Sequence, residues 1–217
     1  MTFAFLLESH FMPRSRTLHP LRRSELPQDA AELARFLIGK TLVRELRRNG
    51  ETRRILARIV ETEAYVPGDA AAHSFIGQTA RNRSLFLERG HAYVYFCYGM
   101  HYMLNVSAEA EGTGAGVLFR AAEPLEGAER MQGFRTARDP RKIASGPGRL
   151  ARAMHVKRTL DGLDITHVGP LWIAAPLRPV GEIAISVRIG ITKEAHRPLR
   201  FFERGNPAVS GPRHMNE

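Results

Sequence analysis

The sequence predicts a single domain of mixed α and β structure that is rich in strands. Three features predict it: an amphipathic helical segment near the N-terminus, one long alternating strand, and a Tyr- and Val-rich segment broken by a turn. No repeat, linker or low-complexity segment divides the chain. A length of 217 residues suits one compact domain with its own core.

The first two elements follow from the spacing of their apolar residues. From Pro27 the apolar side chains recur on one helical face until Gly39, which predicts an amphipathic helix. From Arg53 to Tyr65 the residues alternate, which predicts a strand. Alternation assigns one face of that strand to the following residues: Ile55, Ala57, Ile59, Glu61, Glu63 and Tyr65.

The later elements are shorter. We expect residues 66–90 to form a turn and a loop with one short helical turn. We expect residues 91–107 to form a hairpin of two strands, with its turn at 98–101. Further predictions are a strand at 117–120, helical character over 124–138, a helix at 149–156, and strands at 171–175 and 183–191. We expect residues 1–17 to form a basic arm, residues 18–207 to form the domain, and residues 208–217 to form a tail.

Charge is the most informative part of the composition. Lys and Arg number 32 against 22 acidic residues, a net charge of +10, which favours a polyanionic partner such as nucleic acid. Residues 1–60 and 130–160 are basic, whereas residues 61–129 between them are acidic. Phosphate-binding surfaces beside a carboxylate-rich pocket would produce this pattern, and so would a solvated basic face without a partner.

Composition also excludes several classes of protein. The apolar content of 43% is typical of a globular chain rather than a disordered one. The single cysteine, Cys97, cannot form an intramolecular disulfide, and no apolar run is long enough to span a membrane. The apolar run 3–7 is too short for a signal peptide, so we expect a cytoplasmic protein, nucleoid-associated if bacterial, without a membrane partner.

Two carboxylates and a tyrosine lie where the predicted strand enters a loop. Glu61, Glu63 and Tyr65 share a face that is otherwise apolar, and buried carboxylates are costly unless they are paired or used. They are therefore candidates for catalysis. The alternative is a structural ion pair with an arginine such as Arg58 or Arg120.

Aromatic residues mark the predicted hairpin. Alternation places Tyr93 and Tyr95 on one face and Tyr98 next to the turn, where its exposed ring would suit a wedge that enters a base stack. The alternative is that these tyrosines are ordinary strand residues. Asn105 and Arg120 are polar residues in apolar runs at the ends of neighbouring strands, and their alternative role is to cap those strands.

A phosphate-binding segment and two negative findings complete the pattern. Ser145-Gly146-Pro147-Gly148 precedes a helix with Arg149 and Arg152, which favours a grip on phosphate over a dinucleotide fingerprint because no strand precedes it. No residues have metal-ligand spacing, so we expect no metal and no cofactor. The chain has only four lysines, none of them in these motifs, so Schiff-base chemistry has no agent.

Taken together, these motifs resemble the alkyladenine (3-methyladenine) DNA glycosylase family, which includes the eukaryotic-type methylpurine DNA glycosylase and its bacterial homologues. The resemblance covers about residues 18–207. It rests on ordered segments: IVETEAY at 59–65, AAHS at 71–74, TARNR at 79–83, YVYFCYGM at 93–100, LFRAAEP at 118–124, SGP at 145–147, RIGI at 188–191 and RPLRF at 197–201.

The resemblance implies a fold and an activity. The fold is α+β, with a mostly antiparallel, open barrel-like β-sheet core surrounded by helices and a protruding β-hairpin that enters DNA. The activity is that of a monomeric, metal-free repair enzyme that flips alkylated or deaminated purines out of double-stranded DNA. These are 3-methyladenine, 7-methylguanine, hypoxanthine and ethenoadenine. It then hydrolyses the N-glycosidic bond and leaves an abasic site, with no lyase step.

The resemblance also implies roles for individual residues. Glu63 matches the general base, and Arg120 matches the residue that holds the attacking water, helped by the backbone carbonyl of Ile189. The base pocket comprises Tyr65, His73, Tyr95 and Asn105, where Asn105 would clash with the exocyclic amine of guanine. Tyr98 and Met100 would intercalate. The expected phosphate contacts are Arg81, Arg83, Ser145, Gly146, Gly148 and Arg149.

This sequence departs from the eukaryotic pattern in the turn after Tyr65 and in the glycine-rich stretch before Arg120, so the width of the pocket stays open. Two other functions also stay open. The first is a DNA-lesion-binding protein without turnover. The second is a saccharide hydrolase that uses Glu61 and Glu63, which fits the paired carboxylates but neither the net charge nor the exposed tyrosine.

Overall fold

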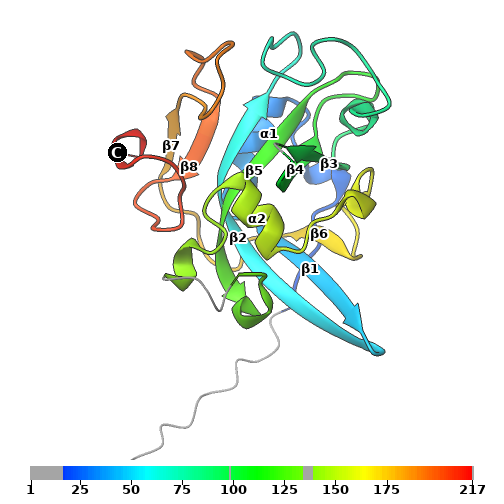
Figure 1. The fold of residues 1–217 in the computed structure, drawn as a ribbon, viewed down its shortest axis with the longest axis vertical. Coiled ribbons are helices and arrows are strands. Elements are labelled where there is room, and N and C mark those ends of the chain that lie inside the picture. Colours follow the sequence, from blue (N-terminus) through cyan, green and yellow to red (C-terminus); the bar gives the residue numbers. More distant parts are fainter. Residues whose placement is uncertain (1–16, 98, 134–138, 217) are drawn as a thin grey trace, which may run out of the picture.

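The computed structural model describes residues 17–97, 99–133 and 139–216. Its centre is an antiparallel sheet with the strand order β3-β4-β5-β2-β1-β6, to which β8 adds at β2 and β7 adds at β8. The bounds of the strands are β1 Thr41–Arg48, β2 Glu51–Tyr65, β3 Ala92–Cys97, β4 His101–Ser107, β5 Gly116–Glu126, β6 Leu171–Ala174, β7 Ile183–Ser186 and β8 Arg200–Glu203. The sheet curls into a half-barrel, so the prediction of an α+β domain with an open, barrel-like core is confirmed (Figure 1).

Two α-helices lie among the described residues. The first helix, α1 (Ala30–Leu37), begins after Asp29, whose side chain caps the amides of Ala31 and Glu32. It buries its apolar face against β2 and β5, as its spacing predicts. The second helix, α2 (Pro147–Ala153), packs on β4 and β5. It begins and ends earlier than the predicted 149–156 because Pro147 is preorganised for the first helical turn.

Strand β2 organises the sheet. One of its edges pairs with β5 along most of its length, while its other edge pairs first with β1 and then, near its C-terminal end, with β8. In Figure 1, β2 and β5 cross the middle of the molecule, and β7 and β8 lie beside one half of β2. Residues at the C-terminal end of β2 therefore have neighbours from two distant parts of the sequence.

The alternation along β2 is interrupted, which corrects the predicted assignment of faces. Ile59 and Ala64 both lie in the main core, although they are an odd number of residues apart, and Val60 lies in a second apolar cluster. The change of phase coincides with register shifts between Ile59 and Thr62. Glu63 and Tyr65 consequently lie on the face opposite to Ile59, because the irregular pairing turns two successive residues away from the core.

Strand β5 changes phase at the same place. Phe119 and Ala122 lie in the main core, whereas Arg120 and Ala121 between them point away from it. The pairing of β2 with β5 has the same register before and after the irregular stretch. This is possible because each of the two strands has one additional residue there that faces away from the core. Glu61 and Arg120 are thus brought to the outer face of the sheet together.

Other predictions fare differently. The hairpin of β3 and β4 is confirmed, and so is the short helical turn in the preceding loop, at Arg83–Phe86. The helical character over 124–138 is wrong for the described part, since β5 continues to Glu126 and only a 3-10 turn follows at Ala128–Arg130. Strand β7 ends at Ser186 rather than at residue 191. Neither β1 nor β8 was predicted from the sequence.

The prediction for the basic arm, residues 1–17, lies outside the described residues except for Thr17. Among the residues that the structure does describe, no helix has the length and apolar character needed to cross a membrane.

Candidate active site

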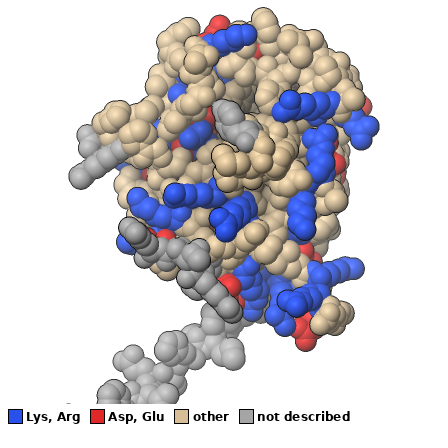
Figure 2. All heavy atoms as spheres, viewed as in Figure 1, with Lys and Arg blue, Asp and Glu red and all other residues tan. Residues whose placement is uncertain are grey.

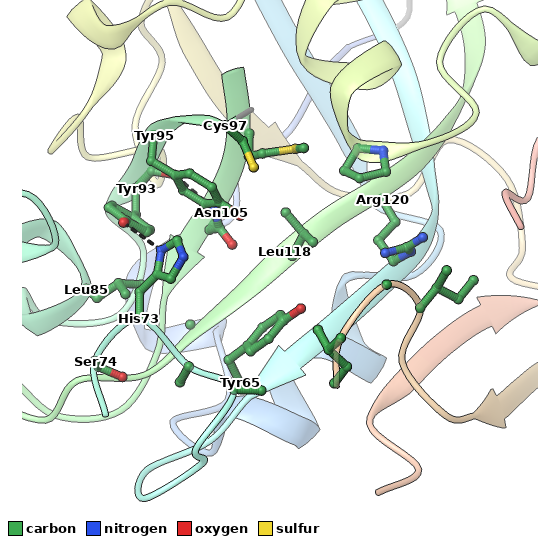
Figure 3. Close-up of a pocket in the computed structure, with 18 residues that line it drawn as sticks. Tyr65, His73, Ser74, Leu85, Tyr93, Tyr95, Cys97, Asn105, Leu118 and Arg120 are labelled. Atoms are coloured by element: carbon green, nitrogen blue, oxygen red, sulfur yellow. Dashed lines mark hydrogen bonds between the residues drawn. The ribbon is translucent and has the colours of Figure 1, made fainter. Parts of the chain in front are cut away.

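A cavity of about 380 Å³ opens on the outer face of the sheet. Its walls come from β2, β3, β4 and β5, from the loop after β2, from the first residue of α2 and from the loop at residues 189–191. Figure 3 shows Tyr93, Tyr95 and His73 on one side of the cavity and Arg120 on the other, with Tyr65 between them. The volume is within the range of pockets that bind small molecules.

Three aromatic rings form one wall of the cavity. The ring centroids of His73 and Tyr95 lie 4.5 Å apart in an edge arrangement, and those of Tyr93 and Tyr95 lie 5.3 Å apart. The Tyr93 hydroxyl lies 3.0 Å from Nδ1 of His73. Burial is the main cause that raises the pKa of Tyr93 to about 12 and lowers the pKa of His73. The wall is therefore neutral and rich in π electrons.

The side chain of Asn82 holds the loop that carries His73. The Nδ2 of Asn82 donates to the carbonyls of His73 and Gly77, at 2.8 and 2.9 Å, and its Oδ1 accepts from the amide of Thr79 at 2.6 Å. Gly114 lies so close to this loop that a Cβ there would stand 2.6 Å from Cβ of Ser74. His73 is thus positioned by packing on two sides.

Tyr65 lines the pocket between the aromatic wall and Arg120. Its ring lies 4.7 Å from the guanidinium of Arg188, which is fully buried and forms an ion pair with Asp69. Arg188 also donates to the carbonyl of Ala64 at 3.0 Å. This ion pair fixes the turn after β2 and the loop after β7 to each other beneath Tyr65. Neither Arg188 nor Asp69 was predicted as a site residue, although a lone arginine in an apolar segment was a usable signal.

A buried glutamate and an arginine occupy the far end of the pocket. Oε1 of Glu63 lies 3.0 Å from Nη1 of Arg120 and accepts the backbone amide of Ile189 at 2.7 Å. Its Oε2 accepts the hydroxyl of Tyr65 at 3.1 Å. Glu63 itself is fully buried, and the three residues that contact its carboxylate line the pocket. Burial raises the pKa of Glu63 above its ordinary value, and these donors offset the effect only in part.

Glu61 has a different environment. Its carboxylate accepts from Nε of Arg120, Nε of Arg200 and the amide of Ser210, all at 2.7 Å. Burial opposes its ionisation, but the two guanidinium groups outweigh that effect and hold its pKa below the ordinary value. The predicted ion pair with Arg120 is thus present for both glutamates, whereas Arg58 pairs with Glu203 instead. Arg200 and Ser210 were not singled out because they are remote from Glu61 in sequence.

The remaining predicted site residues are distributed as follows. Asn105 lines the pocket and donates to the carbonyl of Tyr93 at 3.2 Å. Ile189 reaches Glu63 through its amide, and the structure shows no corresponding contact for its carbonyl. Met100, at the tip of the hairpin, is 69% exposed, and Tyr98 lies outside the described residues.

The predicted phosphate contacts lie at two places on the surface. Arg81, Arg83 and Arg149 are exposed, and Gly146 and Gly148 lie at the start of α2, where Gly148 packs on His101 of β4. Ser145 donates to the carbonyl of Val209 at 3.3 Å. Figure 2 shows Lys and Arg side chains over much of the face on which α2 lies, with few acidic side chains between them. Such a surface attracts polyanions.

Within the described residues, no group of three or more His, Cys, Asp or Glu side chains could hold a metal ion. All four lysines are described, and none of them lines the pocket. Beside the buried carboxylate of Glu63, the pocket offers the guanidinium of Arg120 and aromatic hydroxyls, together with the imidazole of His73, the thiol of Cys97 and the hydroxyl of Ser74.

The chain is similar to a known protein family and to individual proteins over most of its length. The family described as Methylpurine-DNA glycosylase (MPG) matches residues 24–207. A protein of Mesorhizobium japonicum named "Putative 3-methyladenine DNA glycosylase" is 56% identical over 209 residues, which cover 96% of this chain and 99% of that one. The human "DNA-3-methyladenine glycosylase" is 41% identical over 199 residues, covering 84% of this chain and 65% of the human one.

The chain is therefore a DNA glycosylase, a DNA repair enzyme whose partner is DNA. Within that class it belongs to the methylpurine-DNA glycosylase family. The resemblance that the sequence motifs indicated is confirmed over nearly the whole of the span from which it was read.

Proposed function

We propose that this enzyme flips alkylated or deaminated purines out of double-stranded DNA and hydrolyses their N-glycosidic bond with a water that Glu63 activates. The observation that carries the proposal is the Glu63–Arg120 pair, 3.0 Å apart, at the end of an aromatic pocket on a basic protein. The proposed products are a free base and an abasic site. The proposed substrates are 3-methyladenine, 7-methylguanine, hypoxanthine and ethenoadenine.

The aromatic wall suits the base. Tyr65 on one side and His73 with Tyr95 on the other would hold a flipped purine by stacking, and an alkylated purine carries a positive charge that electron-rich rings attract. Asn105 lines the pocket and is proposed to oppose the exocyclic amine of an undamaged guanine. Extruding a base costs a few kcal/mol, and Tyr98 and Met100 are proposed to fill the space it leaves.

The Glu63–Arg120 pair suits the chemistry. Cleavage of a glycosidic bond develops positive charge on the sugar, which an ionised Glu63 would stabilise while it removes a proton from water. Arg120 favours the ionised form of Glu63 and would hold the water against it. An alkylated purine is already a good leaving group, so it needs no general acid. No lysine lines the pocket, which supports a hydrolytic reaction without a lyase step.

The basic surface is proposed to bind DNA independently of its base sequence. Arg81, Arg83 and Arg149, with the start of α2 at Ser145, Gly146 and Gly148, are proposed to contact phosphates on either side of the flipped nucleotide. Binding through such contacts falls steeply as salt rises. The proposed enzyme acts as a monomer, as the resemblance to the family implies.

The deciding experiment measures release of free base from duplexes with one hypoxanthine, one ethenoadenine or alkylated purines. The wild-type protein is expected to release base. Glu63→Gln keeps the shape of the side chain and is expected to bind the same duplexes while losing at least about a thousandfold in rate, since the base for the water is gone. Release by Glu63→Gln at the wild-type rate contradicts the role of Glu63.

Two further outcomes distinguish the alternatives. Tight, salt-sensitive binding to lesion-containing DNA without any release by the wild-type protein would favour a lesion-binding protein without turnover. A preference for neutral glycans over DNA would favour the saccharide hydrolase. Either result overturns the proposed reaction, and only the first leaves the pocket as a site for damaged bases.

A further inference from the structure

Residues 208–216, which lie outside the family match, form a segment that we call the C-terminal strap. Its first residues, Ala208 and Val209, are buried in the second apolar cluster with Val60 of β2 and Ala121 of β5. These two positions flank the irregular pairing that turns Glu61 and Arg120 outward. The strap is thus anchored where the sheet departs from regular alternation.

Ser210 of the strap contacts both members of the Glu61–Arg120 ion pair. Its amide donates to Oε2 of Glu61 at 2.7 Å, and its hydroxyl accepts from Nη2 of Arg120 at 3.4 Å. Nε of Arg120 already donates to Oε1 of Glu61. Two of the three nitrogens of the guanidinium are therefore held by Glu61 and the strap, and the third, Nη1, is left for Glu63.

Arg200 of β8 connects the strap to Glu61 a second time. Its Nε donates to Glu61 at 2.7 Å, while its two terminal nitrogens donate to the carbonyl of Ser210 at 3.1 Å, the carbonyl of Met215 at 3.0 Å and Oδ1 of Asn216 at 2.7 Å. Arg200 is fully buried. A buried guanidinium of this kind needs all its acceptors, and the strap supplies three of them.

Gly211 places the strap against a second contact of Glu63. A Cβ built at Gly211 would lie 2.6 Å from Cδ1 of Ile189, whose amide donates to Glu63. The backbone of Gly211 also has φ of +87°, which glycine adopts without strain. The strap thus reaches Glu63 by two routes, through Arg120 and through Ile189.

We propose that the C-terminal strap is a positioning element of the catalytic site, which holds Arg120 through Ser210 and Ile189 through Gly211 so that both face Glu63. The proposal rests on the proposed function of Glu63 and Arg120. Its physical basis is preorganisation, because a guanidinium between two carboxylates has alternative arrangements and a displacement of about 1 Å costs about a hundredfold in rate. The catalytic unit then extends beyond residue 207.

The test compares two glycine substitutions with the same backbone cost. Gly211→Ala brings a methyl group against Ile189, whereas the control Gly205→Ala has φ of +72° and no atom within 4 Å of its new Cβ. We expect Gly211→Ala to lower the single-turnover rate of base release about tenfold or more below that of Gly205→Ala. The dissociation constant for lesion-containing DNA should be equal in the two variants.

A second substitution tests whether the effect passes through Ile189. Ile189→Val removes Cδ1, the atom that the new methyl group would meet, so the double variant Gly211→Ala with Ile189→Val should recover the rate of Ile189→Val alone. The pH profile provides a further readout. Displacing the amide of Ile189 removes a hydrogen bond that favours ionised Glu63, so the midpoint of the rate profile of Gly211→Ala should move to higher pH.

Equal rates for Gly211→Ala and Gly205→Ala overturn the proposal, and so does an unmoved midpoint with no recovery in the double variant. If Gly211→Ala fails to fold, Ser210→Ala replaces it. That variant removes only the hydroxyl on Arg120, and an unchanged rate and midpoint then overturn the proposal. An inactive wild-type protein rejects the proposed function itself, whereas an active wild-type protein with insensitive strap variants rejects the strap alone.

Discussion

Strand β2 takes part in two buried ion pairs, one near its middle and one near its C-terminal end, and the two pairs differ in the donors that surround the carboxylate. Near the middle of the strand, Arg58 donates to both oxygens of Glu203 at 2.9 Å, and the amide of Gly181 and Nδ2 of Asn206 add further bonds at 2.9 Å. At the C-terminal end, Glu63 has the amide of Ile189 and one nitrogen of Arg120 on Oε1, and only the hydroxyl of Tyr65 on Oε2.

The pKa values of the two carboxyl groups move in opposite directions as a result. Burial opposes the ionisation of both, but the donors around Glu203 outweigh it and lower the pKa of that carboxyl, whereas the pKa of Glu63 is raised. The difference teaches that burial alone does not mark a reactive carboxylate. The mark is a buried carboxylate whose neighbouring charges and donors do not offset the cost of burial, placed behind the wall of a pocket.

The largest expected difference is in stability. Glu203→Gln leaves Arg58 as a buried charge without an anion and should lower the free energy of unfolding by about 3 kcal/mol. Glu63→Gln removes a carboxylate whose ionisation burial disfavours, and Arg120 keeps Glu61, so this variant should be at least as stable as the wild-type protein. Urea denaturation of the two variants checks this, and equal destabilisation would contradict the comparison.

The next difference is in the response to acid. Glu63 must be ionised to act as a base, and its pKa is raised, so the rate of release of alkylated purines should rise with pH up to that pKa and then level off. Below the midpoint the rate should fall about tenfold for each pH unit. Single-turnover rates across the pH range measure this dependence.

The Arg58–Glu203 ion pair should respond to acid at a lower pH than Glu63 does. Because the pKa of Glu203 is lowered in the folded state, its contribution to stability is present above the pKa of an unfolded glutamate and is lost only as pH falls through the lower folded value. On acidification, activity should therefore disappear while this contribution to stability persists. Thermal unfolding at the same pH values provides the control, and simultaneous loss of rate and fold would count against the assignment.

The smallest expected effect is a shift in the pH–rate profile when Oε2 of Glu63 loses its hydrogen bond. Tyr65→Phe keeps the ring over Arg188 but removes the hydroxyl that donates to Oε2, so the midpoint of the rate profile should rise by up to about one pH unit. Tyr93→Phe is the matched control, because the hydroxyl of Tyr93 contacts His73 rather than Glu63. The same shift in both variants would show that the effect is not specific to Glu63.

Local patterns in the sequence predicted the elements that are defined by their own residues. The helix at Ala30–Leu37, the strand ending at Tyr65 and the hairpin from Ala92 to Ser107 each carry the spacing of their secondary structure. The partners of Glu61 and Glu63 were predicted in part, since a lone Arg120 in an apolar run is a natural partner for buried carboxylates.

What was missed depends on contacts between distant residues. Arg200 and Ser210 approach Glu61 only because β8 pairs with β2, and β8 is four residues long and carries no pattern of its own. The opposite facing of Ile59 and Glu63 could not be read from alternation, because it arises from an irregular pairing that involves Arg120 and Ala121 of β5. Such features are properties of the paired strands and not of either sequence segment.

The matched irregularity in β2 and β5 has an evolutionary consequence. Deleting one residue near Val60 would turn Glu63 toward the core and leave Arg120 outside, and deleting one near Ala121 would do the reverse. Only simultaneous deletions, one in the codons of β2 and one in those of β5, would preserve the register between the two strands. Descendants that lose activity through point substitutions are therefore far more accessible than descendants in which this part of the sheet has shifted its register.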